Sequence, residues 1–116
     1  MQDQQPEAPT LRVSVVIVTH NVAAVLRRCL GALEASPDRA QIEIIVVDNG
    51  SRDGCQSIDS EFSGVTVLRL PHHCGLTKAR NIGIRTAKGE FVLLLSPAVV
   101  LEPGAVTKLA DRLLDD

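Results

Sequence analysis

Three clusters of polar residues each follow directly after a run of aliphatic residues in this chain. The first cluster begins at Thr19, the second at Asp48 and the third at Ser96. A carboxylate such as Asp48 only accepts hydrogen bonds, so it suits a ligand that donates N–H or hydroxyl groups. The simpler interpretation of Asp48 is a turn or helix-capping carboxylate, which is common where strands end. Its position beyond a continuous aliphatic run favours ligand binding.

A second candidate group is basic, although the chain as a whole is slightly acidic. Lys78, Arg80, Arg85 and Lys88 all fall within or just after one predicted helix. Arg80 lies near the start of that helix, where the positive end of the helix dipole would help it to meet a diphosphate. We interpret Arg85 and Lys88 as part of a solvated helix face.

The run His72-His73-Cys74 contains metal-ligating residue types. Adjacent residues rarely present ligands to the same tetrahedral centre, and no second ligand pair stands at zinc-site spacing. We therefore predict an ordinary loop here, and no metal ligand is assigned from this run.

Two common nucleotide-binding patterns do not fit the sequence. A dinucleotide-binding Rossmann domain needs glycines in the turn after its first strand, and residues 19–22 contain none. Gly50 and Gly54 follow the second aliphatic run and lack the fingerprint spacing. A phosphate-binding NTPase loop is also excluded, because no glycine-rich loop ends in Lys-Ser or Lys-Thr.

The polar clusters must be positioned by strands. The run 42–47 is almost entirely aliphatic and β-branched, which is typical of a strand covered on both faces in a parallel sheet. The runs 13–18 and 91–95 predict similar strands, and the alternating segment 65–70 predicts a strand near the sheet edge. Ligands bind beyond the carboxyl ends of such strands, where the clusters stand.

Helical spacing predicts four helices, over residues 22–33, 55–62, 76–87 and 103–113. Asn21 is expected to cap the first of them. Alternation of strands and helices predicts an α/β fold with right-handed crossovers. The residues expected to face the core in the last two helices are Leu76, Ala79, Ile82 and Gly83, and Val106, Leu109, Ala110 and Leu113.

Composition narrows the function classes. The 116 residues are 45% hydrophobic and 22% charged, with a net charge of -2, which argues against disorder and against a general nucleic-acid binder. Aromatic residues make up only 2%, so platforms for single-stranded nucleic acid are not expected. The three cysteines are far apart and indicate reduced thiols in a cytoplasmic protein. Residues 1–10 are expected to be a flexible lead-in, and no segment is long enough to span a membrane.

Four stretches of the chain resemble the motifs of family 2 glycosyltransferases of the GT-A type. They are residues 13–21, 44–53, 75–84 and 89–97, and they occur in the family's order and spacing. The resemblance implies a Rossmann-like parallel sheet with strand order 3-2-1-4 and helices on both faces. Residues 11–116 would then be the first, nucleotide-sugar-binding half of a GT-A fold.

The same resemblance implies that the chain binds a nucleotide-diphosphate sugar and transfers the sugar to an acceptor. Thr19 is then expected to touch the base or ribose, and Asp48 to accept a hydrogen bond from the base. The nucleotide-binding residues that the resemblance implies are Val18, Thr19, His20, Asp48, Asn49, Gly75, Lys78, Arg80 and Ser96.

The sequence departs from the family pattern at three positions. The family ends its fourth strand with an acidic motif that binds Mg²⁺ or Mn²⁺, and Ser96 and Ala98 occupy the two corresponding positions. Ala98 supplies no ligand atom, so dependence on that metal is in question. His73 stands where the family usually has Asn. The family's catalytic base lies beyond the matched motifs, and no catalytic residue is assigned.

These departures leave two functions from different classes. The first is sugar transfer by a glycosyltransferase whose acceptor-binding half follows the present chain. The alternative is a non-catalytic nucleotide-binding or scaffold relative that has lost the metal-binding acidic motif. The apolar strand 91–95 has no later strand to cover its free side, so we expect a truncated sequence or self-association through this edge. If the protein associates with a membrane, we expect the contact to come from a region that is missing from this sequence.

Overall fold

The computed structural model describes residues 11–115, so the predicted lead-in of residues 1–10 lies outside the described residues. Four parallel strands form one sheet in the order β3-β2-β1-β4, which confirms the predicted α/β architecture. The strands are β1 (Val13–Thr19), β2 (Ile42–Asp48), β3 (Val65–Arg69) and β4 (Phe91–Leu95). The helices are α1 (Ala23–Glu34), α2 (Ile58–Glu61), α3 (Leu76–Thr86) and α4 (Ala105–Asp115), with 3₁₀ turns at Arg39–Gln41 and Cys55–Ser57.

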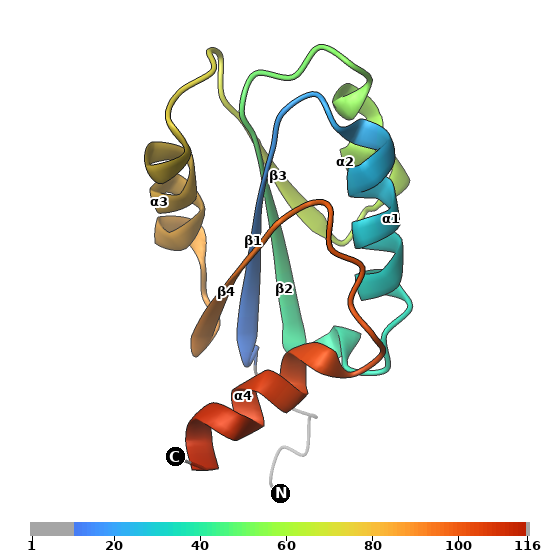
Figure 1. Ribbon diagram of the computed structural model, residues 1–116, viewed down its shortest axis with the longest axis vertical. Coiled ribbons are helices and arrows are strands. Elements are labelled where there is room, and N and C mark those ends of the chain that lie inside the picture. Colours follow the sequence, from blue (N-terminus) through green and yellow to red (C-terminus); the bar gives the residue numbers. More distant parts are fainter. Residues whose placement is uncertain (1–10, 116) are drawn as a thin grey trace, which may run out of the picture.

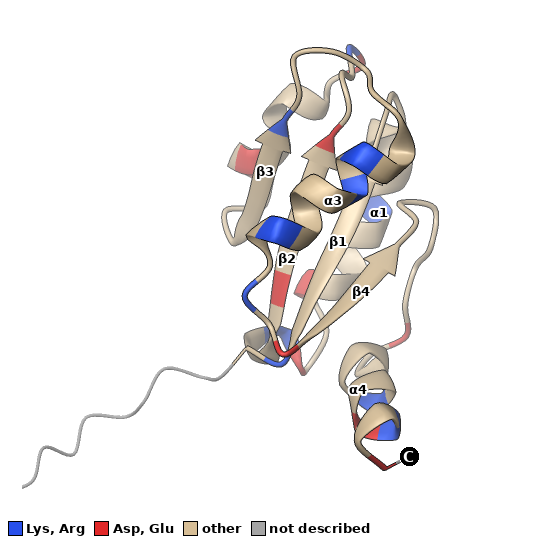
Figure 2. Ribbon diagram, turned by 90° about the vertical axis from the view of Figure 1, so that its left-hand side faces the viewer, with Lys and Arg blue, Asp and Glu red and all other residues tan. Residues whose placement is uncertain are grey.

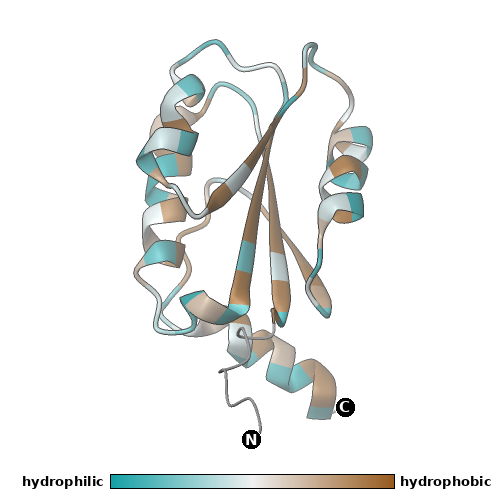
Figure 3. Cartoon of the chain, turned by 180° about the vertical axis from the view of Figure 1, so that it is seen from behind, coloured by the Kyte–Doolittle hydropathy of each residue, from teal (hydrophilic) through white to brown (hydrophobic). Residues whose placement is uncertain are grey.

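Helices cover both faces of the sheet, as the continuous aliphatic runs require. Figure 1 shows α1 and α2 on one face, α3 on the other, and α4 near the end of the sheet where the strands begin. The larger core cluster lies between the sheet and α1, and it is built on Val15, Ile17, Leu26 and Ile44. The smaller cluster lies under α3 and includes Ala79. Figure 3 shows the hydrophobic strands enclosed between helices with hydrophilic outer surfaces.

Helix α3 packs unusually close to the sheet because of Gly83. A Cβ added at this glycine would lie 2.4 Å from Val16 Cγ1 and 3.2 Å from Val47 Cγ2. The prediction that Ala79 and Gly83 face the core is confirmed, since both are buried. The same prediction for Leu76 is wrong, because this side chain is 50% exposed. Leu76 is the first residue of α3, and the elements within residues 11–115 cover only part of its side chain.

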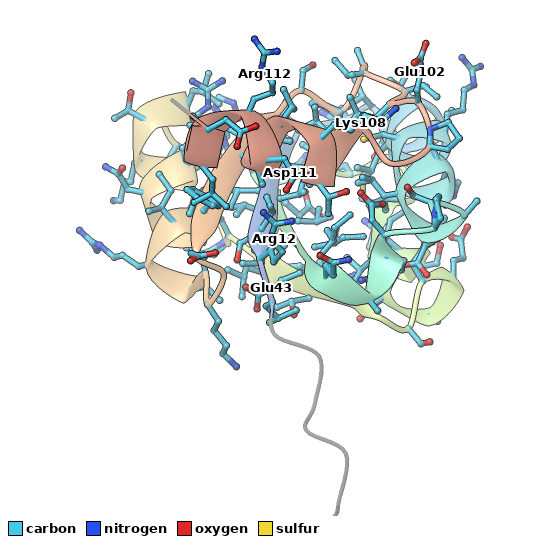
Figure 4. All side chains as sticks on the ribbon, turned by 90° about the horizontal axis from the view of Figure 1, so that it is seen from below. Arg12, Glu43, Glu102, Lys108, Asp111 and Arg112 are labelled. Atoms are coloured by element: carbon cyan, nitrogen blue, oxygen red, sulfur yellow. The ribbon has the colours of Figure 1, made fainter. Side chains whose placement is uncertain are left out.

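Helix α4 is attached by a small number of contacts. Val106 and Ala110 are buried, whereas Leu109 and Leu113 are 50% and 60% exposed, so the prediction that both leucines face the core is wrong. The helix lies across the start of the sheet, and only one stripe of it reaches β1. Figure 4 shows this end of the molecule, where Arg12 forms an ion pair of 3.0 Å with Asp111.

The N-terminus of α4 is held by the loop between α1 and β2. Asp38 is buried, and its Oδ2 accepts hydrogen bonds from Thr107 N at 3.1 Å and Thr107 Oγ1 at 2.9 Å. Ser36 Oγ donates to Asp38 Oδ1 and accepts from Gly104 N. Burial alone would raise the pKa of Asp38, but the hydrogen bonds from Ser36 and Thr107 outweigh it, and the pKa lies below its usual value.

No helix within residues 11–115 is long and apolar enough to cross a membrane.

Candidate functional site

The polar clusters meet at the carboxyl end of the sheet. The parallel register pairs Thr19 with Asp48, and Asp48 with Arg69 on β3. Thr19 is 1% exposed and Asp48 4% exposed, so both side chains lie beneath the surrounding loops. Among the described residues, Thr19 Oγ1 is the buried side-chain atom that has no hydrogen-bond partner. An unpaired buried hydroxyl is rare, and it is available to a ligand or a water molecule.

Hydrogen bonds join the loop after β1 to the loop after β2. Asn49 N donates to Thr19 O at 2.8 Å, and Asn21 N donates to Ser51 Oγ at 2.9 Å. Arg52 N donates to Asn21 Oδ1 at 2.8 Å. Asn21 has a φ of 54°, a left-handed conformation that Asn tolerates better than most residues. The two loops therefore form one continuous wall.

The predicted helix cap at Asn21 is wrong. The N-cap position of α1 is Val22, and the amide of Ala23 donates instead to Asp53 Oδ2 at 2.9 Å. The Ala23 amide is the main reason that the pKa of Asp53 lies below its usual value. Asp53 thus caps α1 from another loop, while the Asn21 side chain joins His20 to Arg52.

Asp48 organises the loop in front of it. Its Oδ1 accepts a hydrogen bond of 3.0 Å from Ser51 N. Its other oxygen, Oδ2, accepts no hydrogen bond from residues 11–115. This oxygen can therefore accept a hydrogen bond from a ligand. Asp48 therefore has both a structural contact and a free acceptor at the end of β2.

A hollow of about 530 Å³ opens beside these loops, and we call it the histidine hollow. The rings of His20 and His73 contact each other in it, with centroids 4.4 Å apart and planes inclined by 57°. The loops after β1, β2 and β3 all contribute to its lining, which consists of His20, Asn21, Gly50, Ser51, Arg52, Leu70, Pro71, His72 and His73.

Asn49 holds the loop after β3 in place. Its Nδ2 donates to Cys74 O at 2.7 Å, and its Oδ1 accepts from Cys74 N at 2.9 Å. The side chain is 3% exposed and lies outside the residues that line the histidine hollow. Gly50 has a φ of +79°, and a Cβ added there would lie 2.9 Å from His73 N. A larger residue at position 50 would therefore push the loop away.

A second, smaller hollow of about 160 Å³ lies between α3 and the end of β4, and we call it the arginine hollow. Val18, Arg80 and Ser96, all predicted as nucleotide-binding residues, line it together with Val16, Leu76, Leu95 and Pro97. Gly75 is the N-cap of α3, so the free amides of its first turn lie near this region. Val18 lies in β1 and His20 follows the end of that strand, so the two hollows are lined by residues close together in the sequence.

Lys78 lies apart from Arg80. It lines a third hollow of about 280 Å³ with Leu70, Pro71, His72, Cys74 and Ile82. Two residues along a helix turn the side chain by more than half a circle, so Lys78 and Arg80 point to different sides of α3. Figure 2 shows the basic residues distributed along α3 rather than gathered at one point.

The residues at the end of β4 do not fit a divalent metal. Ser96 Oγ accepts a hydrogen bond of 3.2 Å from Ala98 N, and Ala98 has no ligand atom. Magnesium and manganese sites use carboxylate oxygens, and neither position supplies one. Within residues 11–115 no group of three or more His, Cys, Asp or Glu side chains is arranged to hold a metal.

The predicted residues therefore divide between several places. His20 lines the histidine hollow, whereas Val18, Arg80 and Ser96 line the arginine hollow. Thr19, Asp48 and Asn49 are buried behind them. The sequence predicts no ligand contact for His73, Asn21 or Arg52, although all three line the histidine hollow. Each of them follows a strand end by a few residues, and this position is the feature of the sequence that could have identified them.

Comparison with known proteins gives one consistent family. The sequence model of "Glycosyl transferase family 2" matches residues 14–116. An N-acetylglucosaminyltransferase of Mesorhizobium japonicum is 30% identical over 113 residues, which cover 92% of this chain and 27% of that protein. The glycosyltransferase AglE of Haloferax volcanii is 34% identical over 88 residues, covering 72% and 29%. The chain thus spans about a third or less of the length of these relatives.

Solved structures show the same fold. The S. aureus TarS fragment 1–349 in complex with UDP-GlcNAc superposes with a TM-score of 0.82 at 24% identity, over 90% of this chain and 32% of that one. A second structure of TarS 1–349 gives a TM-score of 0.81 at 24% identity, over 90% of this chain and 33% of that one. The sheet order and the helix arrangement agree with the GT-A-like fold expected from the sequence motifs. This chain belongs to glycosyl transferase family 2.

Proposed function

We propose that this chain binds the nucleotide diphosphate of a sugar nucleotide and forms the donor-binding part of a glycosyltransferase. The observation that carries the proposal is the pair of hollows at the carboxyl end of the sheet, one lined by His20 just after β1 and the other by Val18 near the end of β1. The histidine hollow offers flat rings and polar loops, and the arginine hollow offers a guanidinium group. A nucleoside diphosphate has a flat base at one end and two phosphates at the other, so its two parts match the two hollows.

Each predicted residue has a role in this arrangement. The base occupies the histidine hollow beside His20, and Asp48 Oδ2 accepts a hydrogen bond from the base or ribose. Thr19 Oγ1, which is buried without a partner, pairs with a ligand hydroxyl or a bound water. Arg80 and Ser96 meet the diphosphate, while Asn49 and Gly75 shape the loops around it. Lys78 points to a different side of α3 from Arg80, so it contacts a part of the ligand that extends past Arg80.

The relatives support this donor class. TarS has been solved in complex with UDP-GlcNAc, and a relative from Mesorhizobium japonicum is named an N-acetylglucosaminyltransferase. A sugar nucleotide with a uracil base and an N-acetylhexosamine is therefore the first donor to test. The acceptor is left unassigned, because the chain spans a third or less of those relatives.

A second candidate function is nucleotide binding without sugar transfer. It is favoured by the end of β4, where Ser96 and Ala98 replace the expected acidic residues. A leaving diphosphate that lacks a metal loses a strong electrostatic stabiliser, which slows transfer more than binding. Both functions use the same nucleotide site, and they differ in whether the bound sugar is transferred to an acceptor.

The proposal predicts that the purified chain binds UDP, GDP or dTDP and that Asp48 contributes to affinity. Replacing Asp48 by Asn removes the charge and keeps an acceptor for Ser51 N, so the loop is retained. Loss of a hydrogen bond to a charged group costs roughly 1.5–3 kcal/mol, and titration calorimetry should show that loss. Asp115→Asn, at the far end of the molecule, is the matched control. If no nucleotide binds, or if Asp48→Asn binds as tightly as the unmodified chain, the assignment is wrong.

A further inference from the structure

We infer that His73 is a nucleobase-binding residue: its ring and that of His20 together form a stacking site for the base. This inference rests on the proposed function, because it concerns the same ligand. It adds a residue that neither the family motifs nor the sequence reasoning assigned, at the position where the family usually has Asn. The ligand class is a planar, uncharged aromatic base.

The two rings lie next to each other in the histidine hollow. Their centroids are 4.4 Å apart and their planes are inclined by 57°, so the rings contact each other at an angle. Both rings line the histidine hollow, and both residues are exposed. Leu70 and Pro71 supply apolar atoms beside them in the same hollow. A flat, weakly polar group therefore fits there better than a phosphate.

The hydrogen bonds of His20 leave only its ring face for a ligand. Its Nδ1 lies 2.8 Å from Asn49 O, so Nδ1 carries the proton and donates to that carbonyl. Its Nε2 lies 3.2 Å from Asn21 Nδ2 and accepts from it. The orientation of the Asn21 amide is fixed in turn, because its oxygen accepts from Arg52 N. With both nitrogens used inside the protein, His20 offers a ligand the face of its ring rather than a nitrogen atom.

His73 is brought to this ring by residues around Asn49. The Asn49 side chain bonds to both the amide and the carbonyl of Cys74, which fixes the backbone next to His73. Gly50 allows that backbone to approach to a distance where a Cβ would clash. Since Asn49 O also accepts the hydrogen bond from His20 Nδ1, a single residue positions both rings. Asn49 is thus a positioning residue for the surface.

His72 also lines the histidine hollow, but among the described residues the rings in contact are those of His20 and His73. The chain has two Phe and no Trp or Tyr. Phe62 and Phe91 are partly buried and pack against the larger core cluster, on the other face of the sheet. The chain has few aromatic side chains, and two of its imidazole rings contact each other in one hollow. This pair is therefore the place where a base can stack. Stacking uses the face of a base and is tolerant of its identity.

The first test is a set of substitutions measured by titration calorimetry with UDP, GDP and inorganic pyrophosphate. Removing a stacking side chain costs roughly 1–3 kcal/mol per base, so His73→Ala should weaken UDP and GDP about five- to hundred-fold and leave pyrophosphate unchanged. His73→Phe keeps a ring face and should retain the affinity. Val100→Ala, which shortens an exposed side chain that lines neither the histidine hollow nor the arginine hollow, is the control. Thermal melting of each variant checks that it is folded.

The second test does not depend on any variant. The chain contains three histidines, so the imidazole carbon–proton signals can be assigned in a nuclear magnetic resonance spectrum. Binding of UDP or GDP should shift the signals of His20 and His73 through the ring current of the base, whereas pyrophosphate should not.

Several results would overturn the inference while the proposed function stands. They are unchanged UDP affinity in His73→Ala, equal losses in His73→Ala and His73→Phe, or histidine signals that UDP and pyrophosphate shift alike. Absence of any nucleotide binding by the unmodified chain would instead remove the proposed function, and the inference with it.

Discussion

Two aspartates of one loop show how similar residues take different roles. Asp48 ends β2 and uses one carboxylate oxygen to accept a hydrogen bond from Ser51 N, which leaves its other oxygen as the proposed ligand contact. Asp53, five residues later, accepts the first amide of α1 and stabilises that helix. The distinction depends on which neighbouring loop each side chain reaches. A sequence motif that contains both aspartates cannot separate the ligand contact from the helix cap.

At the same scale, Ala98 leads to a prediction about metal dependence. Because Ser96 and Ala98 supply no carboxylate, Mg²⁺ or Mn²⁺ should change nucleotide affinity by less than about twofold, as expected when no direct ligand is present. Ala98→Asp should increase the dependence, because a carboxylate is then available at the end of β4. Calorimetry with and without each metal measures this, and Ala98→Asn serves as the uncharged control. A strong metal requirement in the unmodified chain would mean that another group, such as Glu102, had been overlooked.

At the scale of elements, α4 depends on a carboxylate that belongs to another segment. Asp38 accepts hydrogen bonds from Thr107 at the start of α4, and its pKa lies below the usual value. A carboxylate with a lowered pKa in the folded state stabilises the fold above its unfolded pKa of about 3.9. That contribution is lost as the pH falls from about 4 through the folded-state pKa.

Asp38→Ala should therefore lower the free energy of unfolding at neutral pH by about 1–2 kcal/mol, a typical cost of losing a helix cap. The free energy of unfolding of the variant should also fall less steeply below pH 4 than that of the unmodified chain. Urea unfolding at several pH values measures both effects. Asp111→Ala removes an exposed ion pair on the same helix and should cost less than about 1 kcal/mol. Equal effects of the two substitutions would contradict the capping role of Asp38.

Much of the element pattern could be predicted from the sequence, because buried parallel strands require continuous aliphatic runs. The strands at 13–18, 42–47, 65–70 and 91–95 were each placed within a residue of the observed bounds. The errors concern α4 and the start of α3, where helical spacing predicted burial for Leu76, Leu109 and Leu113. Periodicity identifies an apolar stripe, but it does not specify whether a neighbouring element covers that stripe.

The site was harder to predict than the fold. Strand ends and helix starts are visible in the sequence, so position and residue type point to Asp48 and Arg80, whereas Thr19 is implied by the family resemblance. The pairing of His20 with His73 depends on the clamp between Asn49 and Cys74, which spans 25 positions of the sequence. A contact of that kind follows from tertiary structure and leaves no periodic signal.

At the scale of the whole molecule, the sheet has a free edge. Within residues 11–115, β4 pairs on one side only, with β1. Val92 and Leu94 are each 42% exposed there, and further exposed leucines lie on α4. Unpaired strand edges with apolar side chains favour association with another chain.

The present chain should therefore self-associate through the β4 edge, as the sequence also led us to expect. Light scattering across a concentration series should show a rising mean mass. Leu94→Lys places a charge on the edge and should reduce the association. Ile84→Lys changes a side chain of similar exposure, 39%, on α3 and should have little effect. A monomer at high concentration, with the β4 amides protected from hydrogen exchange, would contradict the prediction.

The strand order also determines the sequence in which the sheet can form. Val13 pairs with Ile42 across 29 positions (42 − 13) and with Phe91 across 78 (91 − 13). Closing the longer loop costs about 0.9 kcal/mol more chain entropy, since the cost grows with the logarithm of loop length. We therefore expect β1 to pair with β2 first during synthesis or refolding. The other edge of β1 then stays unpaired until β4 joins the sheet. Pulsed hydrogen exchange should show protection of the β2 amides before those of β4, so the central strand of the finished sheet begins as an exposed edge.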